Sequence, residues 1–258
     1  MACAFSHAIV RSPGHSIAHG LRAHDAGNPD PGQFDLEHRG YIGALERAGV
    51  AVDVLPAWEQ FPDSVFIEDT AVTLGKGAVI LRPGADTRTG ESAAMGQYLK
   101  AYYDDVRQID DPGFIEGGDI LVTDKEIIVG LSARTDRAGA EALKACVADW
   151  GYAVRVLQTP RSILHFKTAC GLVDEETILL TPELAALNYF AGYRTLMVPR
   201  GEEAAANAIA VNDRVFVSAG YPKTADLLTD SGHSVVTLAT GEAAKVDGGL
   251  SCMSLRFG

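Results

Sequence analysis

The sequence predicts one α/β domain, spanning residues 1–258, in which five related units form a ring. Short apolar runs come in pairs joined by tight turns, and amphipathic stretches separate one pair from the next. The units begin at Phe66, Phe114, His165, Asn207 and Cys252, which are 48, 51, 42 and 45 residues apart. Two of these starts are nearly the same word, FIED and FIEG. A period of this size is typical of repeat architectures, whose units cover each other's apolar surface.

The strand pairs and the helices follow one plan along the chain. We expect hairpins at Val65–Leu74 with Ala78–Leu81, Gly118–Thr123 with Glu126–Gly130, Ala169–Val173 with Thr177–Leu180, and Asn207–Val211 with Val215–Ser218. Good helix formers in amphipathic order predict helices at Glu91–Tyr103, Ala138–Trp150 and Pro222–Ser231. The repeat is therefore of the ββαβ type.

The fifth unit is incomplete, because the chain ends just after the run Ser251–Phe257. Its missing partner is expected to be the opening strand Phe5–Arg11, which would close the ring and remove exposed sheet edges. Closure brings the starts of the units together at the centre. An acidic pair, a glutamate, a histidine and a cysteine would then face one another: Glu68 with Asp69, Glu116, His165 and Cys252.

Composition and charge exclude several classes of protein. The chain is 47% hydrophobic, too apolar for a disordered protein, yet no apolar run approaches the roughly 20 residues of a membrane helix. A net charge of −12 argues against nucleic-acid binding and suits a small cationic substrate. The opening residues MACAFSHAIV lack the features of a secretion signal, and the four cysteines are scattered. We expect a cytoplasmic protein with reduced thiols.

Cys252 is the candidate nucleophile. It follows two glycines in the word DGGLSCMS, which allows a tight turn and close approach of a ligand. A cysteine alone is more often an inert core thiol. With His165 and Glu116 at equivalent points of other units, however, nucleophilic catalysis is the better interpretation. The thiolate is the reactive form, so the site must supply a base or a positive charge.

The remaining candidates are carboxylates and arginines. Glu116 lies inside an apolar word followed by two glycines, so it needs a partner, either His165 or a bound cation. The word PDSVFIED contains Asp63, Glu68 and Asp69, for which a solvated loop is an equally good interpretation from spacing alone. Two arginines, Arg88 and Arg134, follow the second strand of successive units. Arginine can hold a carboxylate with two hydrogen bonds, although a single one is more often a surface residue.

The words PDSVFIED, FIEGGD, LSART, LHFKT and DGGLSCMSLRF, in this order and spacing, resemble the dimethylarginine dimethylaminohydrolases. The likeness covers essentially the whole chain. That family belongs to the guanidine-modifying superfamily, the penteins, whose fold is a five-bladed α/β propeller, in agreement with the repeat. The resemblance implies hydrolysis of Nω-methylated L-arginines to L-citrulline and a methylamine, without metal or organic cofactor.

The resemblance also implies a role for each site residue. Cys252 would be the nucleophile, His165 the general acid and base, and Glu116 the acid that orients the histidine or contacts the guanidinium. The substrate-binding residues would be Asp69 and Glu68 at the guanidinium, Asp63 at the amine, Arg88 and Arg134 at the carboxylate, Leu21 in a lid, and Val246 through its backbone. The one departure is Phe166, where the family pattern has leucine, and it would affect pocket shape alone.

Four other interpretations are weaker. Arginine and agmatine deiminases and amidinotransferases share the chemistry, and an arginine deiminase-like hydrolase is the main alternative; the deiminases, however, carry extra helical material. Agmatine has no carboxylate for Arg88 and Arg134 to hold. Ribosome-binding anti-association factors share the fold but would need no nucleophilic cysteine. We therefore expect a small-molecule substrate as the partner, neither nucleic acid nor membrane, and a propeller flank that could support a homodimer.

Overall fold

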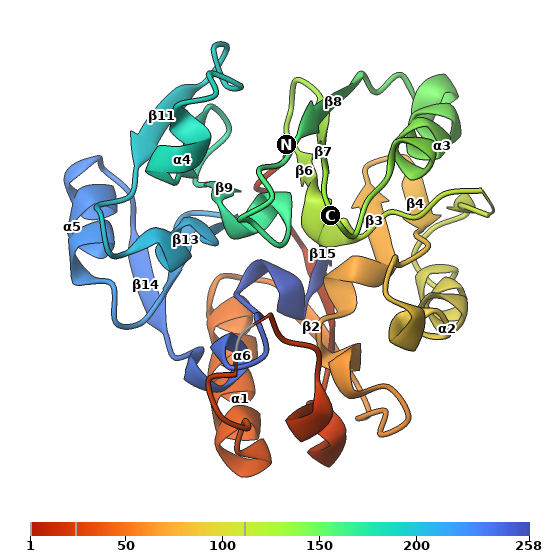
Figure 1. Cartoon of the computed structure of the whole chain (residues 1–258), viewed down its shortest axis with the longest axis horizontal. Helices are drawn as coiled ribbons and strands as arrows, with labels where there is room; N and C mark the ends of the chain where they lie inside the picture. The colour runs from red at the N-terminus through yellow and green to blue at the C-terminus, as the bar shows by residue number, and fades with distance from the viewer. Residues whose placement is uncertain (1, 24, 111) are drawn as a thin grey trace.

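The computed structural model describes residues 2–23, 25–110 and 112–258. In this part of the chain five three-stranded sheets are arranged around a common centre, with the main helices on the outside (Figure 1). In each sheet a middle strand pairs antiparallel with one neighbour and parallel with the other. The five units predicted from the repeat are confirmed.

The sheets follow the chain in order. Their strands are β3 (Ala71–Leu74), β4 (Gly77–Ile80) and β5 (Val106–Gln108); β6 (Ile120–Val122), β7 (Ile127–Leu131) and β8 (Val154–Gln158); β9 (Cys170–Leu172), β10 (Thr177–Leu180) and β11 (Arg194–Met197); β12 (Ile209–Val211), β13 (Arg214–Ser218) and β14 (Val235–Leu238); and β15 (Leu255–Phe257), β1 (His7–Arg11) and β2 (Ala51–Leu55). The middle strands β4, β7 and β10 are almost wholly buried, which agrees with their continuous apolar sequences.

The helices connect the second strand of each sheet to its third. They are α1 (Pro31–Arg47), α2 (Glu91–Leu99), α3 (Arg137–Val147), α4 (Pro182–Ala185), α5 (Pro222–Asp230) and α6 (Gly241–Ala244), the last lying between β14 and β15. Capping explains where the long ones begin: the Asp30 side chain accepts from the backbone of Gln33, and Asp136 accepts from Gly139. The predicted helix at Glu91–Tyr103 ends early, at Leu99, and α1 was not predicted. No described helix is long and apolar enough to span a membrane.

The two ends of the chain close the ring, as predicted. β1 pairs antiparallel with β15, with Ile9 opposite Leu255, and parallel with β2 on its other side. The backbone N–H of Ser6 continues this ladder by donating to Phe257. The fifth sheet is therefore built from both ends of the sequence.

The unit starts are not strands, which corrects the predicted boundaries. The run Val65–Leu74 is extended only from Ala71; the residues before it form two 3-10 turns, Pro62–Val65 and Ile67–Thr70. The same kind of turn precedes the first strand of every other sheet, at Gly117–Asp119, Phe166–Thr168, Glu203–Ala206 and Ser251–Met253. These turns lie at the centre of the ring and carry or flank its polar side chains.

Candidate active site

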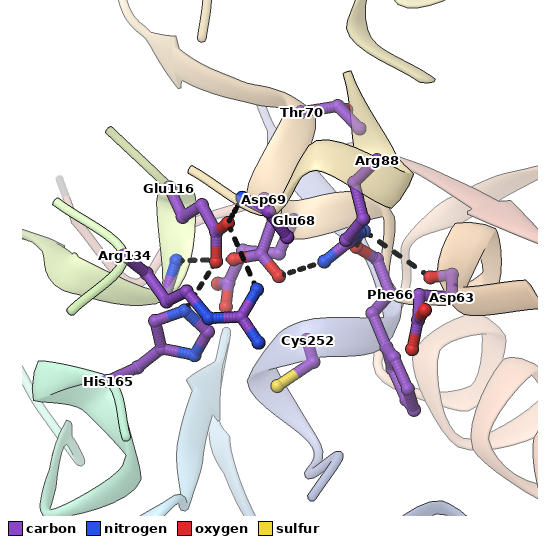
Figure 2. Close-up of polar contacts among 12 residues, drawn as sticks. Asp63, Phe66, Glu68, Asp69, Thr70, Arg88, Glu116, Arg134, His165 and Cys252 are labelled. Carbon is purple, nitrogen blue, oxygen red and sulfur yellow. Dashed lines mark hydrogen bonds and ion pairs between the residues drawn. The ribbon is translucent and has the colours of Figure 1, made fainter. Parts of the chain in front are cut away.

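The turns converge on a small cavity of about 40 Å³ (Figure 2). Every site residue predicted from the sequence except Glu68 lines it: Leu21, Asp63, Asp69, Arg88, Glu116, Arg134, His165, Val246 and Cys252. It adjoins a wider cavity of about 1440 Å³, and Leu164, Asp247, Gly248 and Cys252 line both. Cys252 therefore lies where the two cavities meet.

His165 and Glu116 form an ion pair, with 2.6 Å between Nε2 and Oε2. The glutamate is fully buried; its other oxygen accepts from the backbone of Gly84 and Ala85, at 3.0 and 3.2 Å, and lies 3.6 Å from Arg134. Burial lowers the pKa of His165, but the charge of Asp69 and the bond to Glu116 outweigh it and raise that pKa to about 9. The imidazole is thus a protonated acid at neutral pH, and the contacts of Glu116 suit orienting it.

Cys252 faces this pair across the cavity (Figure 2). Burial, together with the nearby carboxylates Glu68 and Asp69, raises the pKa of its thiol to about 12. The two glycines before it are required by space: a Cβ on Gly248 would lie 2.2 Å from the Phe66 ring, and one on Gly249 2.4 Å from Asn207 Oδ1. The turn brings the thiol into the cavity in its neutral form.

Arg88 is buried, and its guanidinium is bonded mainly to other residues of the protein. Nη1 is 2.6 Å from Asp69 and Nη2 is 2.7 Å from Glu91, while Nη2 also donates to the carbonyl of Phe66 at 2.8 Å. Burial would raise the pKa of Asp69, but the charges of His165 and Arg88 keep it low. Most donors of the Arg88 guanidinium are thus already used within the protein.

Asp63 and Leu21 are joined at one side of the cavity. The backbone N–H of Leu21 donates to Asp63 Oδ1 at 2.9 Å, and the N–H of Ala23 donates to Asp247 Oδ2 at 2.5 Å. These bonds hold the segment around Leu21 against the cavity. Burial raises the pKa of Asp63, although Arg88 partly opposes this. Val246 is buried next to Asp247.

Comparison with known proteins identifies the family of this chain. The arginine deiminase family model matches residues 57–196. An N(G),N(G)-dimethylarginine dimethylaminohydrolase from Pseudomonas aeruginosa is 37% identical over 98% of this chain and 100% of its own length. This chain belongs to the dimethylarginine dimethylaminohydrolase family. A member from Streptomyces coelicolor is 35% identical over 97% of this chain and 96% of its own. The structure of the Pseudomonas aeruginosa protein complexed with citrulline, a cysteine-to-serine mutant, superposes with a TM-score of 0.95, at 36% identity over 98% of this chain and 99% of that one.

Glu68 is the one predicted site residue that does not line the small cavity, and its role at the guanidinium stays a prediction. Its carboxylate accepts from Lys167 Nζ at 2.5 Å and from Ser251 Oγ at 2.9 Å, and it lines a separate cavity of about 380 Å³. That cavity shares no described lining residue with the site. Phe166 is also displaced from its expected role, because its ring is fully buried in the core against Phe190 rather than in the pocket wall.

The dimethylarginine dimethylaminohydrolase site also contains residues that the sequence did not single out. Asp119 is fully buried; it accepts from the backbone of Phe166 at 2.8 Å and from Ser132 Oγ at 2.7 Å. It thereby joins the turn after His165 to the loop of Arg134. A signal was present, since Asp119 ends the word FIEGGD. Glu91 lies outside the words, and Lys167, although part of LHFKT, pairs with Glu68, which is 99 residues away in the sequence.

A cation could in principle lie near three of these side chains. Ligand atoms of Asp69, Glu116 and His165 lie within 4.8 Å of one another. However, Asp69 is already paired with Arg88, and Glu116 with His165. The positive charges that a metal would supply here are provided by the protein, and we assign no metal to the site.

Proposed function

We propose that this chain hydrolyses Nω-methylated L-arginines, with asymmetric dimethylarginine giving L-citrulline and dimethylamine and monomethylarginine giving methylamine. One observation carries the proposal: a thiol, an imidazole paired with a buried glutamate, and a further buried carboxylate all face a single cavity. A substrate guanidinium placed there would lie beside negative charge. The activity named for the relatives and the citrulline complex of the Pseudomonas aeruginosa protein support the substrate class.

The polar ends of the cavity support one orientation of the substrate. Asp63, with one carboxylate oxygen bonded to Leu21, would hold the α-ammonium through the other. Arg134 is the better candidate for the carboxylate, because its side chain is 21% exposed and Arg88 is 5% exposed and internally paired. Asp69 would face the guanidinium. Charge pairs at both ends would fix the reactive carbon next to Cys252.

The chemistry would proceed in two halves. The guanidinium charge beside Cys252 offsets the burial of the thiolate, so the thiol loses its proton to solvent when substrate is bound. Its sulfur attacks the guanidinium carbon, and the carbon–nitrogen bond to the methylated amine breaks as protonated His165 donates a proton to that nitrogen. The cysteine then carries an amidino-thioether. Neutral His165 next takes a proton from water and the hydroxide adds to the carbon. The carbon–sulfur bond then breaks, the proton of the new hydroxyl group returns to the sulfur, and citrulline leaves.

The test is product analysis with two substrates offered separately. Asymmetric dimethylarginine should give citrulline and dimethylamine, while L-arginine gives little product. Cys252→Ser should abolish turnover with the fold intact by circular dichroism. Cys146→Ser, at another half-buried cysteine remote from the cavity, should leave turnover unchanged. Active Cys252→Ser protein would refute the mechanism. Citrulline and ammonia from L-arginine would instead favour the arginine deiminase reading, which the matching family model keeps open.

The proposal extends to the location of the enzyme, its partner and its oligomeric state. We propose a cytoplasmic enzyme, because its four cysteines are all free thiols, the usual state in a reducing compartment. Its partner is a small molecule that carries a guanidinium group. A homodimer through a propeller flank stays a prediction, which sedimentation of the purified protein would check.

A further inference from the structure

Asp119 is a buried carboxylate beside the site that the proposed reaction does not use. It is fully buried at the end of the 3-10 turn Gly117–Asp119, and it lines neither the small cavity nor the wider one. It is therefore not placed to contact a ligand. Burying an ionised carboxylate is costly, so a neutral side chain of the same shape would be cheaper for folding alone. Its contacts show which parts of the site it holds.

Each oxygen of the Asp119 carboxylate accepts a hydrogen bond from a different segment of the site. Oδ1 accepts from the backbone N–H of Phe166, the residue that follows His165, at 2.8 Å. Oδ2 accepts from Ser132 Oγ at 2.7 Å. Both donors are neutral, and two accepting oxygens are the arrangement of an ionised carboxylate. Burial raises the pKa of Asp119, while the charge of His165 and these two bonds oppose the rise.

Ser132 extends the link to Arg134. Its hydroxyl oxygen donates to Asp119 and accepts from the backbone N–H of Arg134 at 2.9 Å. The backbone N–H of Ser132 donates to the carbonyl of Thr135 at 3.0 Å, which closes the loop. The loop that presents the Arg134 side chain to the cavity is thus anchored to the Asp119 carboxylate.

The third connection is to Glu116. The backbone N–H of Asp119 donates to the carbonyl of Glu116 at 3.0 Å, and the backbone N–H of Glu116 donates to Thr135 Oγ1 at 3.1 Å. The side chains of Glu116, His165 and Arg134 lie together at one side of the cavity (Figure 2). One residue therefore joins the three segments that carry them.

We propose that Asp119 is a positioning residue that holds the acid His165 and the carboxylate-binding Arg134 at a fixed distance from each other. The inference rests on the proposed function, which gives His165 and Arg134 these roles. The length of the substrate fixes the distance between its carboxylate and its guanidinium, so a shift of either segment alone would misplace the reactive carbon. An anchor shared by both segments prevents such a shift.

Asp119 also acts on His165 through its charge. The groups that face the imidazole are the carboxylates of three turns and, across the cavity, four further side chains: Asp69, Glu116 and Asp119, then Asp63, Arg88, Arg134 and Cys252. Burial lowers the pKa of His165, whereas the three carboxylates of the turns raise it. Removing the charge of Asp119 should therefore move the His165 midpoint to lower pH.

The experiment measures steady-state kinetics and the His165 titration in Asp119→Asn. The amide keeps the shape of the side chain and an oxygen for the N–H of Phe166, but it loses the charge and the acceptor for Ser132. With asymmetric dimethylarginine, kcat should fall about tenfold to a hundredfold and KM should rise in the same protein, because both segments lose their anchor. NMR titration of ¹⁵N-histidine should find the His165 midpoint at lower pH than in the wild type.

Ser132→Ala tests the connection to Arg134 alone. It leaves the bond between Asp119 and Phe166, so it should raise KM roughly two- to tenfold and leave kcat nearly unchanged. Ser132 also lines the wider cavity, and Ser162→Ala, at another serine of that wall, is the control that should leave KM unchanged. Should Asp119→Asn fail to fold, Ser132→Ala still decides, because Ser132 is only half-buried.

Glu202→Gln is the matched control for the amide substitution. Glu202 is likewise a buried carboxylate that accepts from a backbone N–H and from a hydroxyl, both of Thr224, and it lines neither cavity. Its substitution should lower the Tm without changing kcat, KM or the His165 midpoint.

Two results would overturn the proposal. One is a folded Asp119→Asn protein with wild-type kcat and KM, or with an unchanged His165 midpoint; a lower Tm alone would make Asp119 equivalent to Glu202. The other is a Ser132→Ala protein with an unchanged KM. Because the titration needs no substrate, a wild-type protein that does not hydrolyse methylarginines would contradict the proposed function alone, and the His165 midpoint would still test Asp119.

Discussion

At the scale of single residues, the site consists of charges that are buried in pairs. The pairs are Glu116 with His165 and Asp69 with Arg88; three of these side chains are buried at the centre of the ring, and that of His165 is 12% exposed. Removing one partner of such a pair leaves the other as an unpaired charge inside the protein, which destabilises the fold. The effect of a substitution therefore depends on whether it removes a ligand contact or leaves a charge alone inside the protein.

His165 gives the clearest pH dependence. Its folded pKa of about 9 lies above the unfolded value, so its protonated form stabilises the fold fully below about pH 6.5. That contribution is lost as the pH rises through about 9. NMR titration of ¹⁵N-histidine should find the His165 midpoint near pH 9 in the wild type and at lower pH in Glu116→Gln. The alkaline limb of the turnover profile should move with it; a wild-type midpoint near 6.5 would contradict the ion pair.

Substitutions of Arg88 and of Arg134 should have different effects, the first on the stability of the fold and the second on substrate binding. Arg88→Met leaves Asp69 and Glu91 buried without their partner, and should reduce the free energy of unfolding by about 3–5 kcal/mol. Arg134→Met changes a partly exposed side chain and should cost under about 1 kcal/mol. It should, however, raise KM roughly tenfold or more through a lost charged hydrogen bond of about 1.5–3 kcal/mol. Urea denaturation and steady-state kinetics of the two variants measure both quantities, and a KM effect confined to Arg88→Met would reverse the assignment.

At the scale of elements, the 3-10 turns before the strands carry the function. The sequence predicted the apolar hairpins because buried strands show as continuous β-branched runs. It extended Val65–Leu74 too far, since a tight turn of mixed apolar and acidic residues resembles a strand. The third strand of every sheet was missed (β2, β5, β8, β11 and β14), because these strands are partly exposed and lack a continuous buried apolar run. Residues in repeated words were found; Ser251 and Lys167 were not, because their roles depend on neighbours distant in sequence.

Gly118 shows how closely these turns are packed. An added Cβ would lie 2.8 Å from Cγ of His165 and 3.1 Å from Asp69 Oδ1, so the imidazole must move if the glycine is replaced. Gly118→Ala should lower kcat about a hundredfold, the effect of displacing a reacting group by roughly 1 Å. Gly40→Ala is the control, because its Cβ would meet nothing within 4 Å in α1 and should leave kcat unchanged. Equal activity of the two variants would show that the turn can adjust.

At the scale of the whole molecule, the ring makes the site depend on elements that never touch it. Cys252 is followed within a few residues by β15, and β15 pairs with β1 from the other end of the chain. Each sheet supplies one turn to the centre. The fivefold arrangement was predictable from the spacing of the repeated words, because a ring is the arrangement that lets the first strand complete the last unit.

Ile9→Ala tests this dependence at a position remote from the chemistry. Ile9 is in β1, is 1% exposed, and packs in a core cluster with Ile67 and Leu255, so the cavity left by the substitution should cost about 2–5 kcal/mol. If the ring closes as one cooperative domain, the loss applies to every sheet. Thermal unfolding followed by far-UV circular dichroism and by tryptophan fluorescence should then give one coincident transition at a lower Tm, and activity should disappear over the same range. Leu36→Ala, at an exposed leucine of α1, should leave Tm nearly unchanged. Two separated transitions in the Ile9→Ala protein would mean that part of the ring folds without its closing strand, and the single-domain prediction would then be wrong.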